Sequence, residues 1–426
     1  MCKKRFLRIF WMLVIVGIFM VTVGSPLLAQ EKLRIFWNTG HKYDTYVEIF
    51  EQFEKEFNVK LEIEYLFWPA MRPKLLAQFM SGNPPDLLES HSAWPIEFSL
   101  LGFLQNLDPY ISQWNQYTDW VEGAKTMTSY QGSTYGIKMQ HTTFGLFYNK
   151  QMFEDMALVS VPQTWTELLV AAQKLTRDTD GDGKADVWGF GVHNQLQFFW
   201  PWLVPGGAEL MNEEGTRVAL DSADALRTGR FFQDLIYKHK VTLLMAPGAK
   251  ADFQRKAFAS EKIGMMYSGP WAISVIKKMN PGMSYGIAEI PRPEGYPKRN
   301  ITRGVSLVIP KASKYPDLAW ELIKRLVEVE VEVKVTSEAG QLFPRKSWAA
   351  HPEIAKIEVI QPFIEGLKYA VPYVDKLRRV AAEKWALKVV EDMAQAMYES
   401  ILYNVMPAEK ALKQYTEEAN KILGLE

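Results

Sequence analysis

The chain has 426 residues, of which 48% are hydrophobic and 23% are charged, and its 49 basic and 49 acidic residues cancel. A chain of this length exceeds the size at which one hydrophobic core stops growing, so we expect two domains. Without a net positive charge the protein has no general attraction to polyanions, and we expect neither a nucleic-acid partner nor charge-driven binding to anionic lipid.

The first 29 residues have the pattern of a secretory signal peptide. Basic residues at positions 3, 4, 5 and 8 precede an apolar run at 9–23, and Ala29 offers a small residue for cleavage. A membrane anchor is the alternative, because the run is near the short limit for spanning a bilayer. The single cysteine, Cys2, lies in this leader, so the exported chain is expected to lack disulfides and cysteine metal sites. We predict a periplasmic or otherwise extracytoplasmic protein.

After the leader, strand and helix patterns alternate. Residues 33–37 form an apolar strand pattern, hydrophobic residues at 47, 50, 53 and 57 recur at helical spacing, and 60–66 alternate as a second strand. A helix containing Leu75 and Phe79 and a short strand at 86–90 follow. This order favours a parallel sheet with helices on its faces.

The middle of the chain continues with clear signals. An aromatic strand is predicted at 144–148, and Thr164 with Glu167 three residues later forms a capping box that opens a helix. Helices are also predicted at 226–239 and 319–327, and strands at 285–291 and 304–310.

Motifs along the whole exported chain, in matching order, resemble those of the extracellular solute-binding proteins of ABC importers. The resemblance is to their carbohydrate-binding family, which includes the maltose- and trehalose-type binding proteins. It rests on Gly-Asn-Pro-Pro-Asp-Leu at 82–87, Gly-Phe-Leu-Gln-Asn-Leu-Asp at 102–108, Pro-Gln-Thr-Trp-Thr-Glu-Leu at 162–168, the block from Phe258 to Gly-Pro-Trp at 269–271, and Gly-Gln-Leu-Phe-Pro-Arg at 340–345. Glu261 departs from the pattern, because the family usually has glycine there.

The resemblance implies an α/β fold of the periplasmic-binding-protein type, with two Rossmann-like lobes and a ligand cleft between them. Three crossing strands, near 137–142, 289–291 and 327–337, would form the hinge. The N-terminal lobe would hold residues 31–138 and 290–330, and the C-terminal lobe 141–288 and 337–426. Open α/β sheets bind ligands at the carboxyl ends of their strands, which agrees with this placement.

Sugar binding needs flat aromatic rings for the C–H faces of the sugar and polar groups for its hydroxyls, because an unpaired buried hydroxyl costs about 1–3 kcal/mol. The tryptophans predicted at or just after strand ends are Trp37, Trp68, Trp94 and Trp271. In the family the tryptophan of the Gly-Pro-Trp block stacks on the ligand, so Trp271 is the first candidate. Any tryptophan can instead be a core residue, as we expect of those at 120, 165, 188, 320 and 385.

Polar side chains at the predicted strand ends and crossings complete the candidate site. About half of them are expected to line the cleft, and the others to be ordinary surface groups. The candidates are Asn38, His91, Gln140, His141, Gln195, Gln197, Arg303 and Arg345, with His41, Ser90, His193 and Asn194 as further members.

An acidic loop follows the capped helix. Its carboxylates at Asp178, Asp180, Asp182 and Asp186 have the spacing that begins an EF-hand loop. The twelfth position is Gly189 instead of glutamate, and a strand follows where an EF-hand has a helix. A structural calcium ion and a plain helix-to-strand turn both fit this pattern, and no other cofactor is expected.

These observations predict a monomeric, non-enzymatic protein that captures a mono- or oligosaccharide by hinge closure and delivers it to membrane ABC permease subunits. A secreted polysaccharide-active enzyme is the first alternative and would need two carboxylates facing each other across the cleft. A binding protein for a charged solute, such as a sugar phosphate, a polyamine or an oligopeptide, is the second. It would need clustered charge, for example Arg303 with Arg345.

Overall fold

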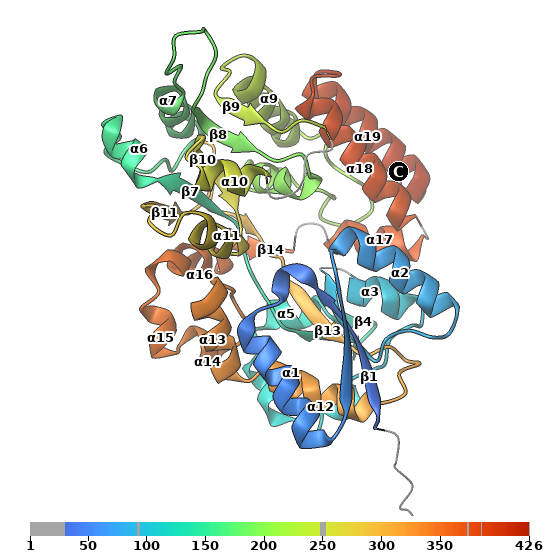
Figure 1. Cartoon of the computed structure of the whole chain (residues 1–426). Helices are drawn as coiled ribbons and strands as arrows, with labels where there is room; N and C mark the ends of the chain where they lie inside the picture. Colours follow the sequence, from blue (N-terminus) through green and yellow to red (C-terminus); the bar gives the residue numbers. More distant parts are fainter. Residues whose placement is uncertain (1–29, 92–93, 248–252, 373–374, 385, 426) are drawn as a thin grey trace, which may run out of the picture.

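The computed structural model describes residues 30–91, 94–247, 253–372, 375–384 and 386–425 (Figure 1). The predicted leader at 1–29, with Cys2, lies outside the described residues. Within the described ranges, no helix is both long enough and apolar enough to cross a bilayer.

The N-terminal lobe is built on a five-stranded sheet in the order β2-β1-β3-β13-β6. β1, β2 and β3 are parallel, as predicted, whereas β13 runs antiparallel to both of its neighbours. Its strands are β1 (Lys32–Asn38), β2 (Lys60–Leu66), β3 (Leu87–His91), β6 (Ile137–Lys138) and β13 (Val305–Val308).

Helices cover both faces of this sheet. On one face Phe36 and Leu88 pack against apolar side chains of α2 and α3, and on the other Ile35 and Leu87 pack against those of α1 and α12. The elements around this sheet are η1 (Thr39–His41), α1 (Asp44–Phe57), α2 (Trp68–Met80), α3 (Trp94–Leu100), α4 (Asp108–Ile111), η2 (Asn115–Asp119), α5 (Glu122–Thr126), β4 (Ser129–Tyr130), β5 (Ser133–Thr134), α12 (Pro316–Leu326) and α13 (Val329–Ala339).

The C-terminal lobe is built on a second five-stranded sheet in the order β11-β7-β10-β8-β9. β8 is parallel to β9 and β10, and β7 is antiparallel to β10 and β11. The elements around this sheet are β7 (Gly145–Asn149), α6 (Lys150–Asp155), α7 (Trp165–Leu175), β8 (Trp188–Val192), η3 (Leu196–Phe198), α8 (Trp200–Leu203), α9 (Ala223–Tyr237), β9 (Thr242–Leu244), α10 (Phe253–Ala259), β10 (Ile263–Ser268), α11 (Trp271–Met279) and β11 (Tyr285–Ala288).

The remaining segments connect the lobes or add to them. α18 and α19 pack against each other, and α19 packs on α9, at the C-terminal end of the molecule (Figure 1). The remaining segments, in chain order, are β12 (Asn300–Ile301), α14 (Lys346–Ala349), α15 (Pro352–Ala355), η4 (Glu358–Ile360), α16 (Gln361–Leu367), β14 (Ala370–Val371), α17 (Asp375–Glu383), α18 (Leu387–Leu402) and α19 (Ala408–Leu423).

The predicted local signals agree with the structure at several points. The capping box is present, because Thr164 accepts from the amide of Glu167 and the Glu167 carboxylate accepts from the amide of Thr164. The strands of the two sheets divide between the predicted lobes, although the lobe boundaries themselves stay predictions.

The third crossing was expected to be a strand, and this is wrong. Residues 329–339 form helix α13, which packs on α1.

Glu261, where the family usually has glycine, adopts a left-handed backbone with φ +58°. This conformation is strained for a residue with a Cβ atom and costs nothing in glycine. We expect Glu261→Gly to raise the free energy of unfolding by about 1 kcal/mol, because relief of strain outweighs the extra entropy of the unfolded chain. Urea denaturation measures the change. Ser260→Gly, next to it without a positive φ, should lower stability; a gain in both variants would contradict the prediction.

A buried carboxylate in α13 gives a pH-dependent prediction. Glu332 is fully buried, and among the described residues neither of its carboxylate oxygens has a hydrogen-bond partner. Burial raises the pKa of Glu332 well above its usual range, although the charge of Arg345 opposes this. Because the folded protein binds this proton more tightly than the unfolded chain does, protonation of Glu332 stabilises the fold at low pH. This stabilisation is lost as the pH rises from the ordinary glutamate range towards the raised pKa.

We therefore expect Glu332→Gln to be more stable than wild type at pH 7, by about 1 kcal/mol or more, because the amide never ionises. The difference should shrink as the pH falls from 7 towards the ordinary glutamate range near 4. Urea titrations of both proteins from pH 4 to 8 measure it. A difference that stays constant with pH would show that Glu332 does not titrate in this range.

Candidate functional site

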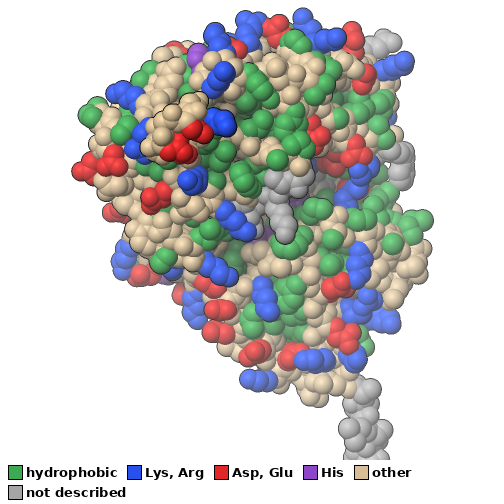
Figure 2. All heavy atoms as spheres, turned by 45° about the horizontal axis from the view of Figure 1, so that its top comes forward, with side chains coloured by type: hydrophobic (Ala, Val, Ile, Leu, Met, Phe, Trp, Pro, Cys, Tyr) green, Lys and Arg blue, Asp and Glu red, His purple; other side chains and the backbone are tan. Residues whose placement is uncertain are grey.

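The lobes meet at the chain crossings. Thr142 on the first crossing and Arg303 before β13 exchange backbone hydrogen bonds of 3.0 and 2.8 Å. Beside them, Gly304 has φ +139°, and a Cβ there would lie 1.9 Å from the carbonyl oxygen of Gln140. Only glycine allows this approach of two backbones. Figure 2 shows the surface hollowed between the two parts of the molecule, with histidine visible in the hollow.

Aromatic rings gather at the carboxyl ends of β1 and β3. The half-buried Trp68 ring lies 5.0 Å from His91, 5.6 Å from Trp94 and 5.9 Å from His41, measured between ring centroids. Arg303 joins this group, because its Nη2 lies 3.2 Å from Nε2 of His91. The structure thus brings together four predicted candidates, Trp68, His91, Trp94 and Arg303, with His41 beside them.

A buried carboxylate that was not predicted organises this cluster. Glu89 is fully buried and accepts a 2.8 Å hydrogen bond from the amide of Asn38 and a short one from Nδ1 of His41. It thereby fixes the turn after β1 and the orientation of His41. Nδ2 of Asn38 is buried and has no partner among the described residues. A free amide donor of this kind suits a hydroxyl acceptor.

His91 is held neutral. Burial lowers the pKa of His91 well below its usual range, and the charge of Arg303 adds to this effect. A neutral imidazole can both donate and accept a hydrogen bond, which suits a hydroxyl better than it suits a cation. The cluster therefore combines apolar ring surface with hydroxyl-compatible polar atoms.

Trp271 stands on the C-terminal lobe. It was predicted at or just after a strand end, and it is the first residue of α11, which follows β10. Its half-buried ring packs edge-on against Phe144, with centroids 5.5 Å apart. A Cβ at Gly269 would lie 2.2 Å from this ring, so the glycine lets the indole fold back over the preceding chain.

The polar candidates on the first crossing and after β8 are only partly accessible. Gln140 and His141 are buried, and Nε2 of Gln140 and Nδ1 of His141 have no partner among the described residues. Burial lowers the pKa of His141 to about 3, with a further contribution from Lys138. Gln195 and Gln197 are half-buried and joined by a 2.8 Å hydrogen bond.

Two predicted residues lie in the protein interior instead. Trp37 is fully buried, packs edge-on against Tyr46 and Phe50, and therefore has no surface to offer a ligand. Arg345 is also buried, and its guanidinium donates to the Asp119 carboxylate, to the carbonyl oxygen of Val327 and to Oε1 of Gln116. We correct both assignments: each side chain is part of the N-terminal lobe's structure.

The acidic loop between α7 and β8 is exposed. One carboxylate oxygen from each of Asp178, Asp180 and Asp186 lies within 4.8 Å of the others, whereas Asp182 is outside this group. The carboxylates also accept hydrogen bonds within the loop, for example Asp178 from the amides of Gly181 and Gly183. The calcium site stays a prediction.

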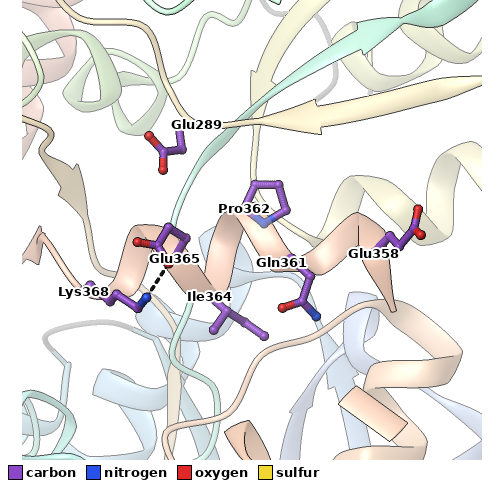
Figure 3. Close-up of a pocket in the computed structure, with 7 residues that line it drawn as sticks. All are labelled: Glu289, Glu358, Gln361, Pro362, Ile364, Glu365 and Lys368. Carbon is purple, nitrogen blue, oxygen red and sulfur yellow. Dashed lines mark hydrogen bonds and ion pairs between the residues drawn. The ribbon is translucent and has the colours of Figure 1, made fainter. Parts of the chain in front are cut away.

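A separate hollow of about 620 Å³ lies beside the second crossing, between Glu289 and helix α16 (Figure 3). Its acidic groups include Glu358 and Glu365, and Glu365 pairs with Lys368. No aromatic ring is among its lining residues. It therefore does not offer the apolar platform that a sugar ring needs.

Comparison with known proteins places the chain in a family. The model of the bacterial extracellular solute-binding protein family matches residues 38–332. The chain belongs to this family. A binding protein of Brucella abortus (strain 2308) is 26% identical over 307 residues, which cover 69% of this chain and 72% of the relative. The maltotriose-binding protein of Pyrococcus abyssi is 23% identical over 340 residues, covering 76% and 69%.

A solved structure agrees in fold. The solute-binding protein of an ABC transporter from Thermotoga lettingae, bound with α-D-tagatose, matches 93% of this chain and 100% of its own with a TM-score of 0.82 at 24% identity. The predicted two-lobe α/β fold of the periplasmic-binding-protein type is thus confirmed.

Proposed function

We propose that this solute-binding protein captures a carbohydrate outside the cytoplasm and delivers it to the membrane permease of an ABC importer. The observation that carries the proposal is the ring cluster of Trp68, Trp94, His41 and His91 at the strand ends of the N-terminal lobe. The predicted leader and the family's extracellular location are consistent with it. Similar proteins that bind α-D-tagatose and maltotriose support the ligand class.

The chemistry of the cluster fits a sugar ring. The half-buried indole of Trp68 offers an apolar face, and Asn38, His91 and Arg303 place donors around it. A saccharide held here would exchange hydroxyl–water hydrogen bonds for bonds to these groups, while its C–H face covers the ring.

Capture proceeds by closure about the crossings. A ligand favours the closed state only by the contacts that it gains there, so groups on both lobes must touch it. Trp271 is the candidate on the C-terminal lobe, and Trp68 is the candidate on the N-terminal lobe. The permease would then recognise the closed protein, and no chemical step is needed.

A thermal-shift screen of the leaderless protein tests this function. The screen includes mono-, di- and oligosaccharides, sugar phosphates and polyamines. A neutral sugar at a hundred times its dissociation constant should stabilise the protein by about 2.7 kcal/mol and raise its melting temperature. Chromatography of the incubated sugar should detect no product. A response to charged solutes alone, or consumption of the sugar, would refute the proposal in favour of the corresponding alternative.

Removing one indole should weaken binding without unfolding the protein. For the sugar found in that screen, we expect Trp271→Ala and Trp68→Ala each to lower affinity about tenfold to a hundredfold, because each loses a stacking surface. Isothermal titration calorimetry measures this effect. Phe67→Ala is the matched control, because this neighbouring ring is 64% exposed and should be dispensable. Equal losses in all three variants would argue against stacking.

A further inference from the structure

Helix α17 (Asp375–Glu383) is anchored to the C-terminal lobe. Leu377 and Ala381 are buried in the core cluster that α9, α18 and α19 share. Nζ of Lys376 donates to the carbonyl oxygen of Asn212 at 2.9 Å and to that of Glu213. Arg378 pairs with Glu391 of α18 at 3.0 Å. The helix should therefore move with the C-terminal lobe as one body.

The same helix also contacts the N-terminal lobe. Nη2 of Arg379 donates to the carbonyl oxygens of Thr126, at 2.8 Å, and Ser129, at 3.2 Å. The hydroxyl of Tyr130 donates to the Glu383 carboxylate at 3.4 Å, and α17 packs along α3. In Figure 1, α17 lies beside α18, and it contacts both α18 and α3.

A hinge motion would affect the contacts of α17 with the C-terminal lobe and its contacts with the N-terminal lobe differently. Contacts to Asn212, Glu213 and Glu391 stay within one lobe and survive any rotation about the crossings. The bonds from Arg379 join two bodies, so a rotation that moves α17 away from Thr126 and Ser129 must break them. In both bonds a charged guanidinium donates to a backbone carbonyl oxygen. Such charge-assisted hydrogen bonds are stronger than hydrogen bonds between neutral groups. The arrangement that the structure describes therefore has a stabilising contact between the lobes that needs no ligand.

We propose that α17 is a closure strap whose Arg379 holds the lobes together before ligand arrives. This inference rests on the hinge closure in the proposed function. A strap that raises the closed fraction of the free protein also raises apparent affinity, because the apparent dissociation constant is the intrinsic one divided by the binding-competent fraction. Arg379 would thus set affinity without touching the ligand.

Distance measurements on the ligand-free protein test the strap. The leaderless chain has no cysteine, so spin labels can be placed at Lys55→Cys on α1 and Glu417→Cys on α19, both exposed sites on opposite lobes. Pulsed electron resonance should find a short-distance, closed population in the parent. Arg379→Ala should shift the closed-to-open ratio about tenfold towards open. Lys384→Ala removes a positive charge near the end of α17 and should leave the distribution unchanged.

Arg379→Lys keeps the positive charge but loses the planar guanidinium group that donates to two carbonyl oxygens at once. We therefore expect this variant to favour the open state as well. Melting curves check that each variant is folded. A parent that is entirely open, an Arg379→Ala distribution equal to the parent's, or an equal shift in Lys384→Ala would overturn the proposal. Since no ligand is used, failure here is distinct from failure to bind a sugar.

Discussion

Replacing Arg345 by alanine is expected to lower the free energy of unfolding by about 3 kcal/mol, because it leaves the buried carbonyl oxygen of Val327 and the partly buried Asp119 carboxylate without their donor. The guanidinium donates to the Asp119 carboxylate, to the carbonyl oxygen of Val327 and to Oε1 of Gln116. It also lies over the Trp120 ring, 4.8 Å from the centroid. One side chain therefore ties the end of α12 to the segment before α5.

Urea denaturation measures the loss, with Arg325→Ala as the matched control. Arg325 pairs with Glu56 on the surface, and such exposed pairs are worth about 0–1 kcal/mol. The folded fraction of Arg345→Ala should still respond to the sugar found in the thermal-shift screen, because Arg345 has no surface in the cleft. Loss of sugar binding without loss of stability would restore Arg345 as a ligand residue.

Gly304→Ala is expected to destabilise the protein by about 3 kcal/mol or more. The new Cβ would lie 1.9 Å from the carbonyl oxygen of Gln140, so one backbone must move, and alanine is also strained at φ +139°. The two crossing segments are paired at Thr142 and Arg303, so the shift would also disturb the proposed hinge. We expect weaker sugar binding in addition to a lower melting temperature.

Gly123→Ala is the control for this substitution. Gly123 lies in α5 with open space around its Cβ position and without a positive φ, so alanine should stabilise the helix by about 0.5–1 kcal/mol. Calorimetric melting of both variants checks the prediction. A Gly304→Ala protein as stable as wild type would show that the crossing can relax at little cost.

Local signals made much of the fold predictable. The Thr164 capping box and the strand at 144–148 are read directly from neighbouring residues. The failed assignments depended on contacts between distant residues. Trp37 and Asn38 are adjacent at a strand end, and register decides which side chain faces the core. Arg345 was a candidate because it lies near a predicted crossing, and its partners Asp119 and Gln116 are more than two hundred positions away, so its neighbours in sequence did not indicate the ion pair.

The candidate site was predictable in its residue types but not in its arrangement. Trp68, His91, Trp94 and Arg303 were candidates because they follow strands or lie at crossings, and the structure places them together. Glu89 was missed because a single carboxylate in a short strand looks like a surface residue. A sharper signal was available: Glu89 follows the apolar pair Leu87 and Leu88, and a carboxylate in a buried strand needs donors, which Asn38 and His41 supply.

The position of β13 has a consequence for the order of folding. This strand lies between β3 and β6, yet it is synthesised about 170 residues after β6. The amino end of α1 is likewise capped by the carboxylate of Glu338, 294 residues further along. The N-terminal lobe can therefore close its sheet only after most of the chain has been made. A nascent chain that cannot fold early stays unfolded for longer, which would suit the export that the predicted leader at 1–29 implies.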